Sequence, residues 1–414
     1  MLQTYVSKIV LTVMCVLLAA CSAVDIEIKD YAEPESYPAV SRLTTESPVK
    51  VKRIWSVNVG SASEQEFIKL IPAVTETAIY SVSAQGHIKA WSRDKHKKLW
   101  YKKIDENITG GIFAGYGVVL VGSSEGTVIA LNSENGEELW RQELSGEVLA
   151  PPQANGRFVV VQLANGTLHG LDFKTGEKKW LYKSPVPPLT LRGTSIPQIE
   201  KQLVFTGFAN GRVVALDIIT GMALWETSIY LPEGGTELEQ VVDVDGDIVV
   251  DANSIYAASY QGRVVSLFKQ NGRPIWKNNA SNYLGLEKGL AQIYSIEEDG
   301  VVRAYHSETG DLVWEQDFMK GRQLSAPAIQ INYLVVGDLE GYLYWIRQSD
   351  GEVVARKLLG RGSISSPYRW SFKGLRNKNE QVTDFRVFSK PVVKDSVLYV
   401  QNQYGALVAY QIIE

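Results

Sequence analysis

A glycine is followed fourteen residues later by a tryptophan at six places in this chain of 414 residues. The six pairs are Gly86/Trp100, Gly126/Trp140, Gly166/Trp180, Gly211/Trp225, Gly262/Trp276 and Gly300/Trp314. A seventh unit has Gly341 with Ala355 at the Trp position, and an eighth has Gly405 but ends before its Trp position. Trp55, near the other end of the chain, supplies the missing tryptophan. Eight units with a period of roughly 40 residues are typical of a propeller, a solenoid or a repeat array.

Within each unit, short apolar stretches alternate with turn pairs such as Asn135-Gly136 and Thr175-Gly176. These pairs favour tight hairpins because glycine adopts a positive φ without steric penalty. The predicted fold is therefore all-β: an eight-bladed β-propeller of four-stranded antiparallel blades, each burying its faces against its neighbours. The tryptophan rings are expected to dock between adjacent blades, each burying about 150 to 250 Å².

The two ends of the repeat region are predicted to pair. The last unit stops at Glu414 without its outer strand, so the segment Lys52 to Val57 is expected to add as that strand. Pairing of the N- and C-terminal segments would close the ring and remove an exposed sheet edge. Residues 49–414 are therefore predicted to be one propeller domain, although their number alone would suggest two or three domains.

The N-terminus has the pattern of a bacterial lipoprotein signal. An apolar run from Ile9 to Ala20 is too short to span a bilayer and directly precedes Cys21. Residues 1–20 are predicted to be the signal peptide, after which Cys21 becomes the lipid-modified N-terminus. Ser22, in a place where Asp would resemble an inner-membrane retention signal, favours the outer membrane. Residues 21–48 are polar and proline-containing, and are predicted to be a flexible tether with an average reach of about 30 Å.

Composition argues against several functional classes. The leader contains one lysine and no acid, so 41 of the 42 basic residues and all 46 acidic residues remain after it, a net charge of −5. No basic stripe is seen along the sequence, and a nucleic-acid partner would need one. Cys21 would be the single cysteine left after cleavage, so no intramolecular disulfide is expected.

Three motifs suggest chemistry but fit the repeat better. Gly122 to Gly126 matches G-x-S-x-G, yet the same repeat position elsewhere is a hairpin. Asp243 to Asp247 resembles the start of a calcium loop but lacks the later Gly and Glu that an EF-hand needs. The four histidines occupy four different repeat positions, so no metal or catalytic cluster is predicted. We therefore expect no enzymatic activity and no cofactor.

The unit from Gly211 through Gly221 to Trp225 is similar to the repeat of quinoprotein (PQQ) dehydrogenases. With eight copies and a lipoprotein signal, the chain after its leader resembles the propeller lipoproteins of the outer-membrane β-barrel assembly (Bam) machinery. The resemblance implies a non-catalytic scaffold, anchored by lipid in the outer membrane and facing the periplasm. It also implies binding to the periplasmic POTRA region of BamA, with incoming outer-membrane proteins as further expected partners.

The same resemblance implies which loops bind BamA. The implied partner-binding residues are Leu189, Leu191, Arg192, Asp243 and Asp245. On the residues alone, the two leucines follow a proline cluster that disfavours strand, and they either project beside Arg192 as a binding hot spot or fold back onto the blade. The two aspartates are either acceptors for a partner or turn residues that bond their own backbone.

Two other functions stay open from the sequence. A quinone-dependent dehydrogenase would need calcium ligands and an axial pocket, and this chain has neither a vicinal cysteine pair nor a large insertion to build one. A ring that binds cell-wall glycans is the other alternative.

The spacing between Gly341 and Gly405 grows to 64 residues, and the excess, Tyr368 to Arg386, mixes cations with aromatic residues. This excess is predicted to be a solvated loop, or else a contact with lipid headgroups or another subunit.

Overall fold

The computed structural model describes residues 48–60, 68, 70–231, 235–359, 386–403 and 405–413. Cys21, the predicted signal peptide, all but the last residue of the predicted tether, and the predicted loop from Tyr368 up to residue 385 lie outside these residues. The described part of the chain belongs to a single compact unit, Val40–Glu414. Within it, no helix has the length and apolar character needed to cross a membrane.

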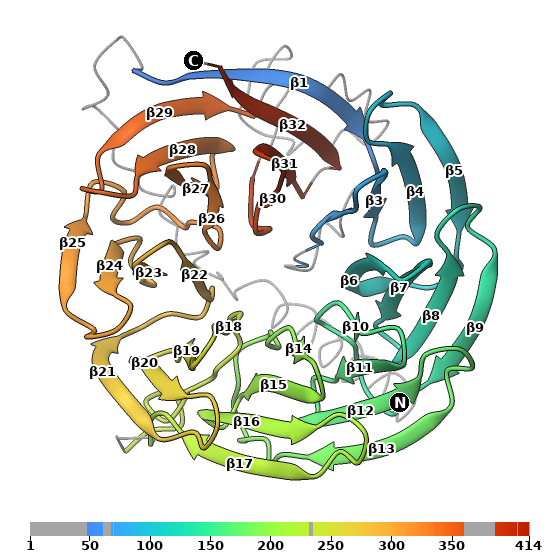
Figure 1. Cartoon of the computed structure of the whole chain (residues 1–414), viewed down its shortest axis with the longest axis horizontal. Helices are drawn as coiled ribbons and strands as arrows, with labels where there is room; N and C mark the ends of the chain where they lie inside the picture. Colours follow the sequence, from blue (N-terminus) through green and yellow to red (C-terminus); the bar gives the residue numbers. More distant parts are fainter. Residues whose placement is uncertain are drawn as a thin grey trace, which may run out of the picture. The chain divides into compact units, whose positions relative to one another are not determined.

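The described residues form eight four-stranded antiparallel sheets that follow one another round a ring (Figure 1). Blade 1 contains β2 (Ala73–Val74), β3 (Ala78–Val82), β4 (His87–Ser92) and β5 (Lys98–Lys103). Blade 2 contains β6 (Ile108–Gly115), β7 (Val118–Ser123), β8 (Thr127–Asn132) and β9 (Glu138–Glu143). Blade 3 contains β10 (Gln153–Ala154), β11 (Phe158–Gln162), β12 (Thr167–Asp172) and β13 (Lys178–Lys183). Blade 4 contains β14 (Gln198–Glu200), β15 (Leu203–Phe208), β16 (Arg212–Asp217) and β17 (Ala223–Ser228).

The second half of the ring repeats the same order. In blades 1 to 7 the first strand along the chain lies nearest the centre, and in blade 8 this place is taken by β30. Blade 5 contains β18 (Val249–Val250), β19 (Ser254–Ala258), β20 (Gly262–Phe268) and β21 (Pro274–Ala280). Blade 6 contains β22 (Leu286–Lys288), β23 (Gln292–Ile296), β24 (Val302–His306) and β25 (Leu312–Gln316). Blade 7 contains β26 (Ala328–Gln330), β27 (Tyr333–Gly337), β28 (Tyr342–Arg347) and β29 (Val353–Leu358). Blade 8 joins β30 (Val392–Lys394), β31 (Val397–Gln401) and β32 (Ala406–Ile413) to β1 (Lys50–Asn58).

Blade 8 confirms the predicted closure. Strand β1 pairs antiparallel with β32 through eight residue pairs, from Lys50↔Ile413 to Asn58↔Ala406, with one irregularity between Arg53 and Trp55. The N–H of Val59 extends this contact by donating to the Gly405 carbonyl at 2.7 Å. The outer strand of the last blade thus comes from the start of the propeller sequence, and the predicted all-β, eight-bladed propeller is confirmed.

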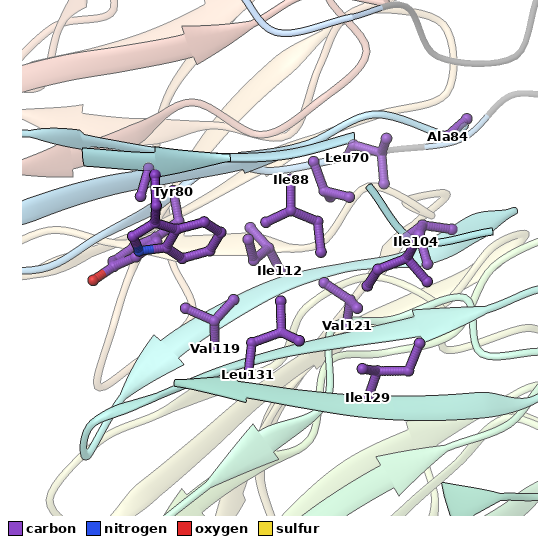
Figure 2. Close-up of a cluster of buried hydrophobic side chains, with 14 of the residues drawn as sticks. Leu70, Tyr80, Ala84, Ile88, Ile104, Ile112, Val119, Val121, Ile129 and Leu131 are labelled. Carbon is purple, nitrogen blue, oxygen red and sulfur yellow. The ribbon is translucent and has the colours of Figure 1, made fainter. Parts of the chain in front are cut away.

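Adjacent blades share their apolar cores. Figure 2 shows Tyr80 and Ile88 of blade 1 facing Val119 and Leu131 of blade 2. Ile88, Val119 and Leu131 are fully buried, and Tyr80 is 4% exposed. Because each sheet covers one face of its neighbour, no blade can bury its apolar residues alone, which is why the repeat forms a ring.

The repeat glycine lies in the turn between the second and third strands, where a side chain would not fit. In blade 2, Gly126 has φ +86°, and a Cβ atom there would lie 2.5 Å from the carbonyl oxygens of Leu144 and Gly146. The Gly126 carbonyl accepts the N–H of Leu144 at 2.9 Å. The turn therefore holds the chain that leaves the fourth strand for the next blade, and this close approach requires glycine.

The repeat tryptophans dock between blades, as predicted. In six blades the indole N–H donates to a backbone carbonyl in the next blade, at 2.7–3.0 Å. The tryptophans are Trp100, Trp140, Trp180, Trp225, Trp276 and Trp314. Trp55, the predicted equivalent in blade 8, stacks on His96 in the β4–β5 hairpin of blade 1, with the ring planes 14° apart. His96 has φ +53°, and Gly136 holds a positive φ in the corresponding hairpin of blade 2.

Blade 7 exchanges the large and small members of the repeat pair. In the blades with a docked tryptophan, the residue opposite it on the neighbouring strand is small, such as Ala130 opposite Trp140. In blade 7, Trp345 lies opposite Ala355 instead, and both are fully buried. The Trp345 indole donates to Gln330 Oε1 at 2.8 Å, and its ring meets Tyr410 of blade 8 edge-on. The space that the repeat tryptophan fills in other blades is therefore filled in blade 7 by Trp345, from the adjacent strand β28.

Candidate partner-binding site

The structure brings the two predicted partner-binding segments together. Residues 189–193 lie in the loop from β13 to β14, and residues 243–245 lie in the loop from β17 to β18. The Leu191 N–H donates to Asp243 Oδ2 at 2.5 Å. A Cβ atom on Gly193 would lie 2.9 Å from Asp245 Oδ2, so the backbone of one loop packs directly on the other. Segments about fifty residues apart in sequence thus form one site on two adjacent interblade loops.

Leu189 and Arg192 lie at the solvent-exposed surface of this site. The Leu189 residue is 40% exposed, the Arg192 side chain is also 40% exposed, and Leu191 is half-buried. Arg192 Nη2 donates to Glu147 Oε1 at 2.7 Å, and Glu147 belongs to the loop from β9 to β10. Leu189 and Arg192 therefore project from the loop, which is the first of the two alternatives left open by the sequence. Leu191 is only partly accessible and also packs inward.

Asp243 differs from both alternatives suggested by its sequence. Its residue surface is fully buried, so a partner approaching from solvent does not reach its carboxylate. The hydrogen bond that it accepts comes from Leu191 in the other loop, not from a turn of its own. The second oxygen, Oδ1, is buried without a hydrogen-bond partner among the described residues. Asp243 therefore holds the 189–193 loop through this bond, which would be costly to lose because the buried carboxylate has no other hydrogen-bond donor among the described residues.

Asp245 is half-buried and lies beside a pocket formed by several interblade loops. Arg192, Thr194, Asp247 and Lys390 line the same pocket. Lys390 Nζ lies 2.8 Å from Glu287 Oε2 and 3.9 Å from Asp247 Oδ2, linking a residue that precedes blade 8 to blades 5 and 6. The charged residues of the lining are therefore largely ion-paired, whereas most of the remaining lining is apolar and includes Leu149, Ile196 and Leu284. Among the described residues, no group of three or more His, Cys, Asp or Glu side chains could hold a metal ion.

Sequence reasoning missed two residues of this region, Glu147 and Lys390. Each is an isolated charged residue in a different interblade connection, with no local motif around it. The repeat itself was the available indication, because Glu147, Arg192 and Asp243 all lie in connections between successive blades. Such connections of successive blades lie side by side in a propeller, so charged residues in them become neighbours.

Burial of Asp243 predicts a pH dependence of stability. Burial raises the pKa of the Asp243 carboxyl from 3.8 to about 7, although the hydrogen bond from Leu191 opposes this shift. The folded protein then holds a proton that the unfolded chain has lost between about pH 4 and pH 7, so this group makes folding less favourable as the pH rises through that window. The neutral variant Asp243→Asn keeps an oxygen for the Leu191 N–H. We expect its melting temperature to gain on that of the wild type between about pH 4 and pH 7, measured by calorimetry at both ends of the window; a constant difference would contradict the raised pKa.

Eight four-stranded blades, tryptophan docking and a glycine-tryptophan repeat define an eight-bladed propeller of the PQQ-like repeat class, with a candidate binding site on two interblade loops. The family model described as "Outer membrane protein assembly factor BamB" matches residues 84–298 and 298–412. The chain belongs to this BamB family.

Relatives in the same family cover nearly the whole chain. A Pseudomonas aeruginosa outer membrane protein assembly factor BamB is 46% identical over 364 residues, covering 88% of this chain and 90% of the relative. The BamB of Kangiella koreensis is 43% identical over 354 residues, covering 86% of this chain and 89% of the relative. A solved structure of BamB from Moraxella catarrhalis superposes with a TM-score of 0.76 at 26% identity, covering 87% of this chain and all of that one.

The propeller is also shared with enzymes. The quinohemoprotein alcohol dehydrogenase from Comamonas testosteroni superposes with a TM-score of 0.65 at 13% identity, covering 87% of this chain and 76% of the enzyme. At that identity the likeness concerns the fold alone. The names of the similar relatives favour an assembly factor over the dehydrogenase alternative.

Proposed function

We propose that this chain is a non-catalytic scaffold of the Bam complex that binds the periplasmic POTRA region of BamA through residues 189–193. The supporting observation is the exposed pair of Leu189 and Arg192, on a loop that is held in place from the next blade by Asp243. An apolar side chain beside arginine on an ordered loop has the composition of a binding hot spot. By bringing BamA into the complex, the scaffold would aid folding and insertion of outer-membrane proteins, with incoming barrel chains as further partners.

The proposal assigns different parts to the five residues. Leu189, Arg192 and the accessible part of Leu191 would contact BamA. Asp243 would act indirectly by holding the loop, because its own carboxylate is buried. Asp245 would support the backbone at Gly193 and lies beside the pocket. Replacing Asp243 should therefore weaken binding through loop disorder and not through a lost direct contact.

The test of the proposed site is the triple variant Leu189→Ala, Leu191→Ala and Arg192→Ala. Truncating an anchor at the centre of an interface costs about 2 kcal/mol or more, roughly thirtyfold in affinity. We expect loss of BamA co-purification with an unchanged circular dichroism spectrum, and a cell envelope that is more permeable to large antibiotics.

A matched control removes the same chemical groups from turns elsewhere on the blades. Leu290 and Ile331 are exposed apolar residues in the β22–β23 and β26–β27 turns, and Arg273 is exposed in the β20–β21 hairpin. Their combined replacement by Ala should leave BamA binding at the wild-type level. If the first triple variant binds BamA with unchanged affinity, or the control loses binding equally, BamA must use another face of the ring.

We also propose that Cys21 carries lipid and anchors the propeller to the outer membrane, facing the periplasm. Cys21→Ala should leave a folded protein that no longer fractionates with membranes. Stable anchoring needs two or more acyl groups, so a partly modified wild type would show a soluble fraction. Separation of inner and outer membranes, followed by immunoblotting, gives the measurement. Undiminished outer-membrane association of the variant would rule out lipidation as the main tether.

A further inference from the structure

Three consecutive outer strands of the ring carry positive charge and no negative charge. These strands are β29, β1 and β5, which belong to blades 7, 8 and 1 and follow one another along the outer edge (Figure 1). Their cations are Arg356, Lys357, Lys50, Lys52, Arg53, Lys98, Lys102 and Lys103. We call these eight residues the basic arc. The arc does not show as a basic stripe along the sequence, because it is assembled from three distant segments.

The arc departs from the rest of the rim. The other five outer strands together hold five cations and four acids: Arg141, Lys178, Lys179, Lys183 and Lys277 against Glu138, Glu143, Glu226 and Glu315. Lysine on an exposed edge strand also discourages edge-to-edge aggregation. That function would apply equally to the edges β9, β17 and β25, which carry glutamate instead. Edge protection therefore does not account for concentration of the cations on three neighbouring blades.

Most of the charge in the arc is available to an external anion. Six of its eight cations are exposed; Arg356, which lies over the Tyr342 ring at 4.3 Å, and Lys102 are half-buried. The exposed Lys103 forms an ion pair with Asp105, with 3.5 Å between Lys103 Nζ and Asp105 Oδ1. In the part of the chain that the structure describes, no carboxylate forms an ion pair with the five other exposed cations. These five are Lys50, Lys52, Arg53, Lys98 and Lys357.

The position of the arc in the chain identifies what it faces. Its central strand, β1, is the first strand of the propeller, and the sequence leads into it directly from the tether predicted over residues 21–48. A tether of that length reaches about 30 Å on average. Lipidation of Cys21, which belongs to the proposed function, would therefore hold the β1 edge closer to the bilayer than the opposite edge near β13 and β17.

We propose that the basic arc is a membrane-facing surface that binds the anionic phosphate headgroups of the bilayer to which the chain is tethered. Each lysine or arginine close to an anionic bilayer adds about fivefold to its affinity. The attraction falls off within a Debye length, about 8 Å at physiological salt, so it acts only when the ring is already close to the bilayer, where the tether would keep it. Such contact would orient the ring on its edge, leaving the interblade loops free to meet a protein partner.

The test uses the chain beginning at Ser22, without lipid. All eight sheets and the closing β1–β32 pair lie within residues 50–413, so this protein keeps every strand. We expect it to co-sediment with phosphatidylglycerol-containing vesicles at low ionic strength, and neither with pure phosphatidylcholine vesicles nor at about 1 M salt, where the Debye length is about 3 Å. An absence of binding to the phosphatidylglycerol vesicles at low salt overturns the proposal.

Matched variants separate the arc from net charge. Lys50→Gln, Lys52→Gln and Arg53→Gln on β1 should weaken vesicle binding by about a hundredfold. The control is Lys178→Gln, Lys179→Gln and Lys183→Gln on β13, an outer strand with the same number of cations. It should bind almost as the wild type does. Equal weakening by the two variants overturns the proposal, because binding would then follow total charge.

A second variant guards against a folding defect in β1. Lys98→Gln with Lys357→Gln changes only the flanking strands and should weaken vesicle binding by about thirtyfold. BamA co-purification of both arc variants should be unchanged, so failure of this proposal is distinct from failure of the proposed BamA site. If the arc variants keep vesicle binding and lose BamA instead, the arc is a protein interface and the membrane assignment is wrong.

Discussion

Deleting residues 51–58 is expected to open the ring and produce a large fall in melting temperature, with aggregation. The deletion removes nearly all of β1 and leaves β32 as an unpaired edge that can recruit other chains. It also damages both interfaces of blade 8, because Val51 packs in the core shared with blade 7 while Trp55 packs in the core shared with blade 1. The cost should be several kcal/mol, a large part of the 5–15 kcal/mol total of a typical domain.

The measurement is thermal unfolding by circular dichroism, with sedimentation velocity to detect aggregates. A chain that begins at Pro48 is the control, since it lacks the preceding sequence but keeps the whole of β1. It should melt at the same temperature as a chain beginning at Ser22. Identical melting of the deletion variant and this control would mean that β1 does not close the ring.

The propeller was predictable from the sequence because its two geometric requirements leave visible residues. The turn that packs against the backbone leaving each blade requires glycine, as at Gly126. The docking position between blades favours tryptophan, as at Trp140. The last repeat lacks its tryptophan, and Trp55 at the start of the repeat region supplies it, which also predicted that the strand around Trp55 closes the ring. Both features are local to one repeat, so a single sequence displays them.

The candidate site was less predictable because its geometry depends on three loops at once. The sequence marked Leu189 and Arg192 through the prolines before them, and both are exposed. It did not reveal that Asp243 is buried beneath the loop or that Glu147 pairs with Arg192. Those contacts join residues about 45 to 52 positions apart, and no local pattern encodes them. The role of the site in binding BamA stays a proposal.

The basic arc illustrates the same limit for charge. No outer strand carries more than three cations, so a scan along the sequence finds no basic run. Three such strands become neighbours only because β1 is inserted between blades 7 and 1 when the ring closes. Ring closure thus creates a surface property as well as a stable fold, and the residues around Lys50 contribute to both.

Ala355 shows how a departure from the repeat is compensated within a blade. A tryptophan at this position would need a carbonyl in the next blade's hairpin, as Trp314 uses the Gln348 carbonyl. Blade 8 has no such hairpin, because its two outer strands, β32 and β1, come from opposite ends of the chain. Trp345 fills the space instead, and its partner Gln330 donates in turn to the Tyr410 carbonyl of blade 8 at 3.2 Å.

Trp345→Ala should therefore destabilise the protein by about 3 to 5 kcal/mol, the usual cost of removing a buried tryptophan side chain. The indole is fully buried, and its loss also leaves Gln330 Oε1 without its donor. Denaturant unfolding at constant m-value gives the change in free energy. Trp345→Phe, which keeps most of the apolar volume but not the N–H, should lie between the Ala variant and the wild type.

The double variant Trp345→Ala with Ala355→Trp tests why the exchange occurred. It restores the arrangement of the other blades and returns the lost apolar volume to the same interface. Because blade 8 offers no hairpin carbonyl at this point, the new indole N–H would be buried without an acceptor, at a cost of about 1 to 3 kcal/mol. We therefore expect only partial rescue of the unfolding free energy. Full recovery would show that volume alone decides the position, and that the chain ends in blade 8 do not explain the exchange.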